Sequence, residues 1–104
     1  MEKRSCERIE ANIEVRFSYG YIFYTGTIVN MSQRGLFIST KNRLPNNSVL
    51  LVLFRLEDDL LKLLARVKHV DKLYNKHEGM GIELLNPQKE YLQYMESLKP
   101  TCNF

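Results

Sequence analysis

Apolar and polar residues alternate along the segment 11–17. The apolar members lie at every second position: Ile13, Val15 and Phe17. Successive side chains of a β-strand point to opposite faces of the sheet, so a period of two is typical of a strand with one buried face. The sequence therefore predicts a first strand over 11–17, followed by a turn at Ser18-Tyr19-Gly20.

Five more strands are predicted further along the chain. Residues 21–30 are rich in β-branched and aromatic side chains, which suit a pleated surface, and Gly26 in their middle suggests a bulge or a sharp bend. The remaining predicted strands cover 36–40, 49–56, 60–70 and 79–85. The run 49–56 is apolar at almost every position, as in a strand that is buried on both faces.

The segment 60–70 also has the composition of a helix, and Asp59 is a possible N-cap for it. Residues 65–70 nevertheless alternate at period two, and Glu57-Asp58-Asp59 has the composition of a hairpin turn. Two adjacent antiparallel strands explain both features, so a strand is predicted.

A helix is predicted near the end of the chain, where Asn86 and Pro87 fit an N-cap and a first helical residue. Pro100 then stops the helix. Its apolar stripe is predicted at Tyr91, Leu92, Met95 and Leu98. Six short strands followed by one helix predict a mainly β, single-domain fold: a compact antiparallel β-barrel with a C-terminal α-helix.

Length and composition agree with one soluble domain. The chain has 104 residues, of which 44% are hydrophobic and 26% are charged, as in an ordinary globular protein with a single core. The longest apolar runs are too short to cross a bilayer, and no apolar region follows the N-terminal charges. We therefore expect a cytoplasmic protein without membrane insertion.

The sequence carries no familiar catalytic motif, and its potential metal ligands are scattered. His69 and His77 lie in a predicted strand and loop, whereas Cys6 and Cys102 lie near opposite ends of the chain. Gly79-Met80-Gly81 lacks the third glycine and the following helix of a dinucleotide-binding loop. We therefore expect neither an enzyme nor a bound metal or cofactor.

The net charge is +3, and basic residues are concentrated at the N-terminus. Arg4 and Arg8 are four residues apart, so in a turn or helical conformation both guanidinium groups project from one side. Each guanidinium matches a phosphate, or the O6 and N7 acceptors of a guanine edge. The pair suits a guanine nucleotide, although two arginines at this spacing also occur on solvated faces.

A second polar motif, Asn30-Met31-Ser32-Gln33-Arg34-Gly35, lies between the second and third predicted strands. Asn30 and Ser32 can bond their own backbone and Gly35 can take a positive φ, so the motif can be explained as a well-formed turn. The same atoms can also bind a ligand, because amide and hydroxyl groups match a purine edge and glycine permits close approach. Arg34 adds a phosphate or base contact, or it faces solvent.

Together the two motifs, RxxxR and about twenty residues later [D/N]xSxxG, resemble the paired signature of the PilZ domain family. The segments 65–67 and 79–84 also resemble later strands of that family, so the resemblance covers essentially the whole chain. It implies a six-stranded antiparallel barrel of the split-barrel type with a C-terminal helix over 11–104. It also implies a flexible arginine-bearing arm over 1–10 that folds over bound cyclic di-GMP.

The same resemblance implies the site residues and the ligand. Arginines of the arm hold guanine edges and phosphates, and the second motif lines the base site. The implied ligand-binding residues are Arg4, Arg8, Asn30, Ser32 and Gly35, with Lys3 and Arg34 as weaker candidates.

The leading hypothesis is a stand-alone cyclic di-GMP receptor. On binding, its arm becomes ordered and it signals to an unidentified downstream protein in motility, exopolysaccharide or biofilm control. Two alternatives stay open. One is an adaptor of the PilZ fold that binds protein but no nucleotide. The other is a small barrel that binds single-stranded nucleic acid through basic and aromatic residues, although the leading hypothesis includes no nucleic acid polymer as partner.

Overall fold

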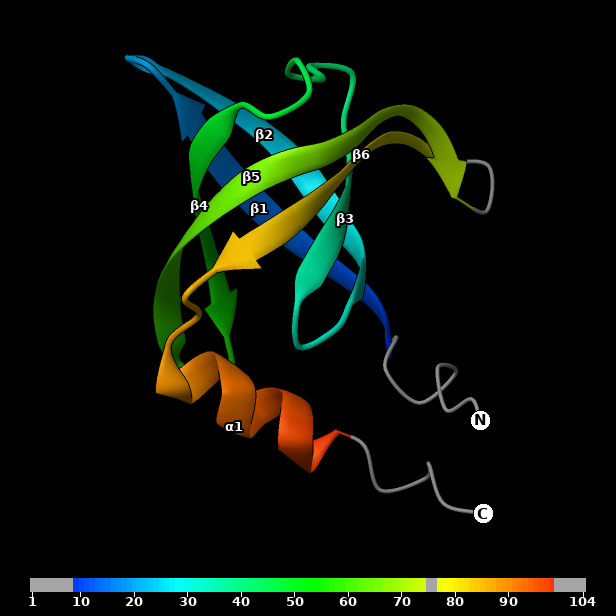
Figure 1. Cartoon of the computed structure of the whole chain (residues 1–104). Coiled ribbons are helices and arrows are strands. Elements are labelled where there is room, and N and C mark those ends of the chain that lie inside the picture. The colour runs from blue at the N-terminus through cyan, green and yellow to red at the C-terminus, as the bar shows by residue number, and fades with distance from the viewer. Residues whose placement is uncertain (1–8, 75–76, 99–104) are drawn as a thin grey trace.

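The computed structural model describes residues 9–74 and 77–98, and these form six strands and one helix (Figure 1). The elements are β1 (Ile9–Tyr19), β2 (Ile22–Met31), β3 (Gly35–Ser39), β4 (Val49–Leu56), β5 (Asp59–Tyr74), β6 (His77–Leu85) and α1 (Lys89–Ser97). All strand pairs are antiparallel, and the order β1-β2-β3-β6-β5-β4 closes because β4 pairs with β1. The predicted barrel with a C-terminal helix is confirmed.

The alternation predicted for the first strand is present in β1, which is longer than expected at both ends. Val15 and Phe17 are buried, whereas Glu14, which precedes them, and Arg16, which lies between them, are exposed. Every strand contributes inward side chains to one core, including Ile28, Ile38, Val52, Leu63 and Met80. Period-two burial therefore explains how short strands of mixed polarity fill a closed barrel.

The ambiguous segment after Asp59 is a strand, as predicted, and it pairs with β4 from Leu56 and Asp59 onward. The two residues between these strands, Glu57 and Asp58, form the predicted acidic hairpin loop. Burial in this strand alternates, with Leu61 and Leu63 inside and Lys62 outside. The period of two outweighed the helical composition because a strand in a barrel wall is stabilised by burying every second side chain in the core, whatever its intrinsic helix propensity.

β4 differs from the prediction of a strand buried on both faces. Its inward residues are Leu50, Val52, Phe54 and Leu56, whereas Val49 is 47% exposed and Leu51 and Leu53 are half-buried. A barrel wall has one face toward the core, and no described layer covers the other. The continuous apolar run therefore reflects an apolar outer surface.

The interpretation of Gly26 as a bulge is also wrong. Pairing with β1 runs through it without interruption, from Val15–Gly26 to Phe17–Tyr24. A Cβ at Gly26 would lie 2.8 Å from Cγ2 of Ile38, so glycine is required by the close approach of β3. The irregularity of β2 occurs three residues later, between Ile28 and Asn30.

The first hairpin turns one residue later than predicted. Ser18 and Tyr19 remain in β1, and the loop consists of Gly20 and Tyr21. Gly20 has a φ of 66°, which is the left-handed conformation that a two-residue hairpin loop requires at its first position.

The helix begins later than predicted. Asn86 has a φ of 57° and turns the chain after β6, so it cannot cap a helix that starts at Lys89 after Gln88. The buried stripe also differs, because Leu92 is 37% exposed and half-buried Tyr94 packs against the core instead. No helix in the described part of the chain is long and apolar enough to cross a membrane.

α1 lies across one end of the barrel (Figure 1). Tyr91 and Met95 insert their side chains into the core from this helix. The Tyr91 ring meets Phe54 of β4 edge to face, with 6.4 Å between the ring centroids. The helix therefore completes the core at the end where β2 turns into β3.

Candidate functional site

The candidate site is built on the turn that joins β2 to β3. The Ser32 N–H donates to the Gly35 carbonyl at 2.9 Å, which closes the turn. The Ser32 Oγ accepts hydrogen bonds from the N–H groups of Arg34 at 3.3 Å and Gly35 at 3.1 Å. Ser32 therefore fixes the shape of the turn through its own side chain, as its residue type predicts.

Two other elements hold this turn in place. The Leu84 N–H of β6 donates to the Arg34 carbonyl at 2.8 Å. From α1, the Tyr91 hydroxyl donates to the Ser32 carbonyl at 2.5 Å. The Gln33 amide also donates to a Glu96 carboxylate oxygen at 3.4 Å. The turn is therefore anchored to both the barrel wall and the helix, although Gln33 and Arg34 themselves are exposed.

Tyr91 is the residue of this site that the sequence did not reveal. It was predicted only as part of an apolar stripe, but its hydroxyl supports the turn from 59 positions away in the sequence. Burial raises the pKa of Tyr91 far above its ordinary value, so the hydroxyl keeps its proton and remains a donor. A buried tyrosine usually needs a hydrogen-bond partner, which is the signal that could have identified it.

Gly35 has a different role from the positive-φ turn residue that its type suggested. Among the described glycines, only Gly20 has a positive φ. A Cβ at Gly35 would collide with the Ile82 carbonyl of β6. The residue is glycine because β3 and β6 approach closely at the site, where Gly35 pairs with Glu83.

Asn30 lies in β2 directly after its irregular position, and its partners in the neighbouring strands are Glu10 and Phe37. The next residue, Met31, is buried in the core, so the side chain of Asn30 lies on the outer face of the wall. Asn30 is only 7% exposed, yet no hydrogen bond joins its amide to another part of the described chain. Asn30 is therefore a nearly buried amide on the outer face of the wall, beside the β2–β3 turn.

β1 begins beside this turn. Its first residue, Ile9, pairs with Met31, and Glu10 pairs with Asn30. Ile9 and Glu10, which were expected in the N-terminal arm, thus belong to the barrel. The arginines predicted to bind the ligand, Arg4 and Arg8, and the weaker candidate Lys3 lie outside the described residues. Arg8 directly precedes Ile9 in the sequence, so the chain enters the barrel at the second motif.

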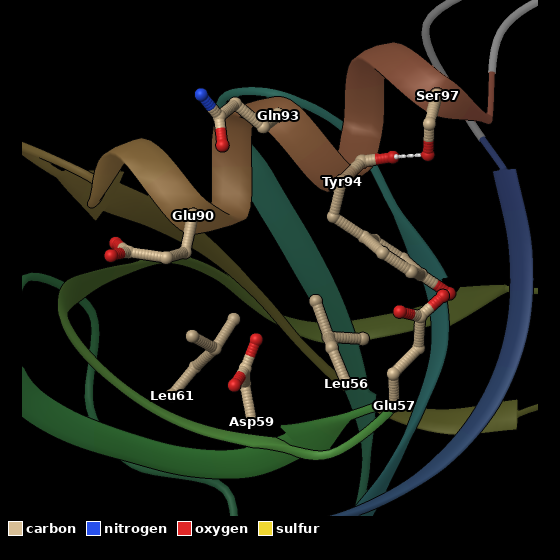
Figure 2. Close-up of a pocket in the computed structure, with 8 residues that line it drawn as sticks. All are labelled: Leu56, Glu57, Asp59, Leu61, Glu90, Gln93, Tyr94 and Ser97. Carbon is tan, nitrogen blue, oxygen red and sulfur yellow. Dashed lines mark hydrogen bonds between the residues drawn. The ribbon is translucent and has the colours of Figure 1, made fainter.

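A cavity of about 240 Å³ lies at the helix end of the barrel, between the β4–β5 hairpin and α1 (Figure 2). Its lining residues are Leu56, Glu57, Asp59, Leu61, Glu90, Gln93, Tyr94 and Ser97. Three carboxylates make this cavity negative, which disfavours an anionic ligand. In the described part of the chain, no group of three or more His, Cys, Asp or Glu side chains is placed to hold a metal ion.

The structure resembles that of the Bacillus subtilis inhibitor of motility MotI/DgrA, with a TM-score of 0.75 and 17% sequence identity. The similarity covers 95% of this chain and 50% of that protein, so this chain spans about half its length. No curated protein matches the sequence. The family model of the PilZ domain matches residues 2–98, a range that includes both polar motifs and every strand. The chain belongs to the PilZ domain family.

Proposed function

We propose that this protein is a cyclic di-GMP receptor that transmits ligand binding to a partner protein. The observation that carries the proposal is the register of β1: Ile9 and Glu10, which follow Arg8 in the sequence, pair with Met31 and Asn30. The strand that follows the first motif in the sequence thus begins beside the second motif. Membership of the PilZ family supports cyclic di-GMP as the ligand.

In the proposed mechanism, Arg4 and Arg8 donate charge-assisted hydrogen bonds to the phosphates and guanine edges. Asn30 offers its amide to a guanine, and Arg34 and Lys3 add weaker contacts with the anion. Ordering the N-terminal arm costs conformational entropy, which the neutralisation of its like charges offsets. The arm that is ordered on binding then presents a new surface to the partner.

The proposal assigns no catalytic step to this chain, no cofactor and no nucleic acid polymer as partner. It places the protein in the cytoplasm. The similar Bacillus subtilis protein is named an inhibitor of motility, so motility is the first process to examine. Exopolysaccharide and biofilm control are the other candidate outputs.

An adaptor that binds no nucleotide is the second candidate, and one observation favours it. Ser32 and Gly35 each have a complete structural explanation, as a turn-forming hydroxyl and as the glycine that β6 requires. The [D/N]xSxxG motif would therefore persist in a protein that uses this turn only for its fold. Asn30 and the arginine pair decide between the two functions.

Isothermal titration calorimetry with cyclic di-GMP tests the proposal. We expect the wild-type protein to bind, and Arg4→Ala combined with Arg8→Ala to weaken binding at least about 100-fold, because two charge-assisted contacts are lost. Asn30→Ala should weaken it about tenfold through the loss of one or two hydrogen bonds. Arg55→Ala removes the same charge from an exposed position of β4 and should change the affinity less than about twofold.

Three results would contradict the receptor function. They are an absence of heat from wild-type protein, equal affinities for the double variant and Arg55→Ala, and displacement of the ligand by a single-stranded oligonucleotide. Unchanged binding in Asn30→Ala alone would remove that residue from the site and leave the arginine pair as its centre.

A further inference from the structure

A row of large apolar side chains crosses the outside of the barrel. Residues that are paired between neighbouring strands form it: Phe23 pairs with Ser18, Ser18 with Leu51, Leu51 with Leu64, and Leu64 with Leu85. We call these five residues the outer row. It runs over β2, β1, β4, β5 and β6, and four of its five members are apolar.

The outer row is accessible. Phe23 is 63% exposed and Leu64 is 48% exposed, and both point away from the core. Leu51 and Leu85 are half-buried, and exposed Val49 and half-buried Leu53 widen the apolar area on β4. Outward positions of an antiparallel wall are usually polar, so half-buried Leu51 of β4 beside exposed Leu64 of β5 indicates a surface that binds another molecule.

The charges beside the outer row are mainly positive. On one side of the outer row, Leu53 pairs with Arg16 of β1 and with Lys62 of β5. On the other side of the row, Val49 pairs with Arg66. Two acidic residues lie nearby: exposed Glu14, two residues before Arg16 in β1, and Glu83, which pairs with Arg66 and lies 3.8 Å from the Lys68 ammonium. An acidic surface is the electrostatic complement of this arrangement.

Two other occupants fit less well. In a two-fold dimer the same patch meets its own copy, so Arg16, Lys62 and Arg66 would face like charges. An anionic membrane complements the charges, but the outer row follows a closed barrel across five strands, with β5 curving between β4 and β6 (Figure 1). A flat surface touches only part of such a curved row.

The outer row is also connected to the candidate ligand site. Its last member, Leu85, follows Leu84, whose N–H donates to the Arg34 carbonyl in the β2–β3 turn. One covalent step and one hydrogen bond therefore join the surface to the turn. A change at the turn on ligand binding has a short route to the outer row.

We propose that the outer row, centred on Leu51 and Leu64, docks an acidic amphipathic segment of a partner protein. Apolar side chains of the partner pack on the leucines, and its carboxylates meet Arg16, Lys62 and Arg66. This proposal rests on the proposed function for the existence of a partner, and it adds a preformed docking surface on the barrel to the surface that the ordered arm presents. It is tested separately, because the docking surface is present on the barrel without nucleotide.

The probe is a synthetic amphipathic peptide of about 18 residues, with leucines on one face and glutamates on the other. We expect it to bind the wild-type protein at least about tenfold more tightly than the same peptide with lysines in place of the glutamates. Leu64→Lys should lower the affinity at least about tenfold, and Arg66→Glu several-fold. Leu60→Lys is the matched control, an exposed leucine on the same strand and face but about 13 Å away, and it should bind normally.

Circular dichroism should show native folds for these variants, and Phe23→Ser replaces Leu64→Lys if that variant does not fold. The acidic docking site is wrong if both peptides bind equally, if neither binds, or if Leu60→Lys and Leu64→Lys behave alike. Dimers that Leu64→Lys abolishes would assign the row to a second copy, and stronger binding to phosphatidylserine vesicles than to the peptide would assign it to a membrane. Titrations with and without cyclic di-GMP separate this result from nucleotide binding: peptide binding without any nucleotide effect would keep the docking site and contradict only the transmission of ligand binding to it.

Discussion

Two hairpin loops of this barrel, Gly20-Tyr21 and Glu57-Asp58, place their first residue at a positive φ, 66° and 58° respectively. Glycine adopts this conformation without strain, whereas a residue with a Cβ loses roughly 1–2 kcal/mol there. The same local geometry is therefore relaxed in the first hairpin and strained in the second. At the scale of single residues, Glu57 is a place where the sequence does not match its backbone.

We expect Glu57→Gly to raise the free energy of unfolding by about 0.5–1 kcal/mol, because relief of the strain exceeds the added entropy of the unfolded chain. Urea denaturation measures this change. The matched control is Asp58→Gly, since Asp58 does not have a positive φ and should gain nothing. Equal stabilities of the two variants would show that the left-handed conformation of Glu57 is not strained.

At the scale of elements, the strands were more predictable than the helix and its contacts. Alternation identified β1 and β5 because burial on one face directly produces a period of two. The helix start at Lys89 was missed because Asn86 satisfies two rules, one for capping a helix and one for adopting a left-handed turn. Local sequence cannot choose between them, whereas the packing of Tyr91 and Met95 can.

The turn motif of the candidate site was predictable from the sequence, whereas the contacts that support it were not. The motif of Asn30, Ser32 and Gly35 was identified, and Ser32 and Gly35 do close a turn directly after the strand that carries Asn30. Its support by Tyr91 and Leu84 was not identified, because those hydrogen bonds join segments about fifty residues or more apart in the sequence. Position 35 requires glycine because the Ile82 carbonyl of β6 lies close to it. The sequence around the turn does not show this contact.

The bond between α1 and the β2–β3 turn gives a prediction about pH. Tyr91→Phe keeps the ring but leaves the Ser32 carbonyl without its donor, so it should cost about 1–2 kcal/mol at pH 7. The pKa of Tyr91 is raised by burial, so folding favours the protonated form. This contribution is fully present below the unfolded pKa of about 10 and is lost as the pH rises above it.

Urea denaturation at pH 7, 9 and values above 10 compares wild type with Tyr91→Phe. The stability advantage of the wild type should be constant at the two lower values and should shrink at the higher ones. Tyr94→Phe, at a half-buried tyrosine of the same helix, is the control and should show a smaller effect at pH 7. An advantage that does not change above pH 10 would mean that Tyr91 ionises in the folded protein as easily as in the unfolded one.

At the scale of the whole molecule, β3 and β6 form a seam of the barrel between strands that are far apart in the sequence. Their ladder runs from Gly35–Glu83 to Ser39–Gly79, with a glycine at each end. A Cβ at Gly35 would meet the Ile82 carbonyl, and a Cβ at Gly79 would meet the Ile38 carbonyl. Backbone atoms cannot move aside as a flexible side chain can, so the close pairing of β3 with β6 depends on both glycines.

We expect Gly79→Ala to lower the free energy of unfolding by about 2–3 kcal/mol, because the added methyl group forces β3 and β6 apart. Urea denaturation gives the loss, and amide hydrogen exchange should show faster exchange along β3 and β6 than along β1 and β4. Ser39→Ala, which adds no atoms at the partner position, should cost less than about 1 kcal/mol. If Gly79→Ala were as stable as Ser39→Ala, the seam would have to tolerate separation of its strands, and the β2–β3 turn could then move on ligand binding without disturbing the barrel.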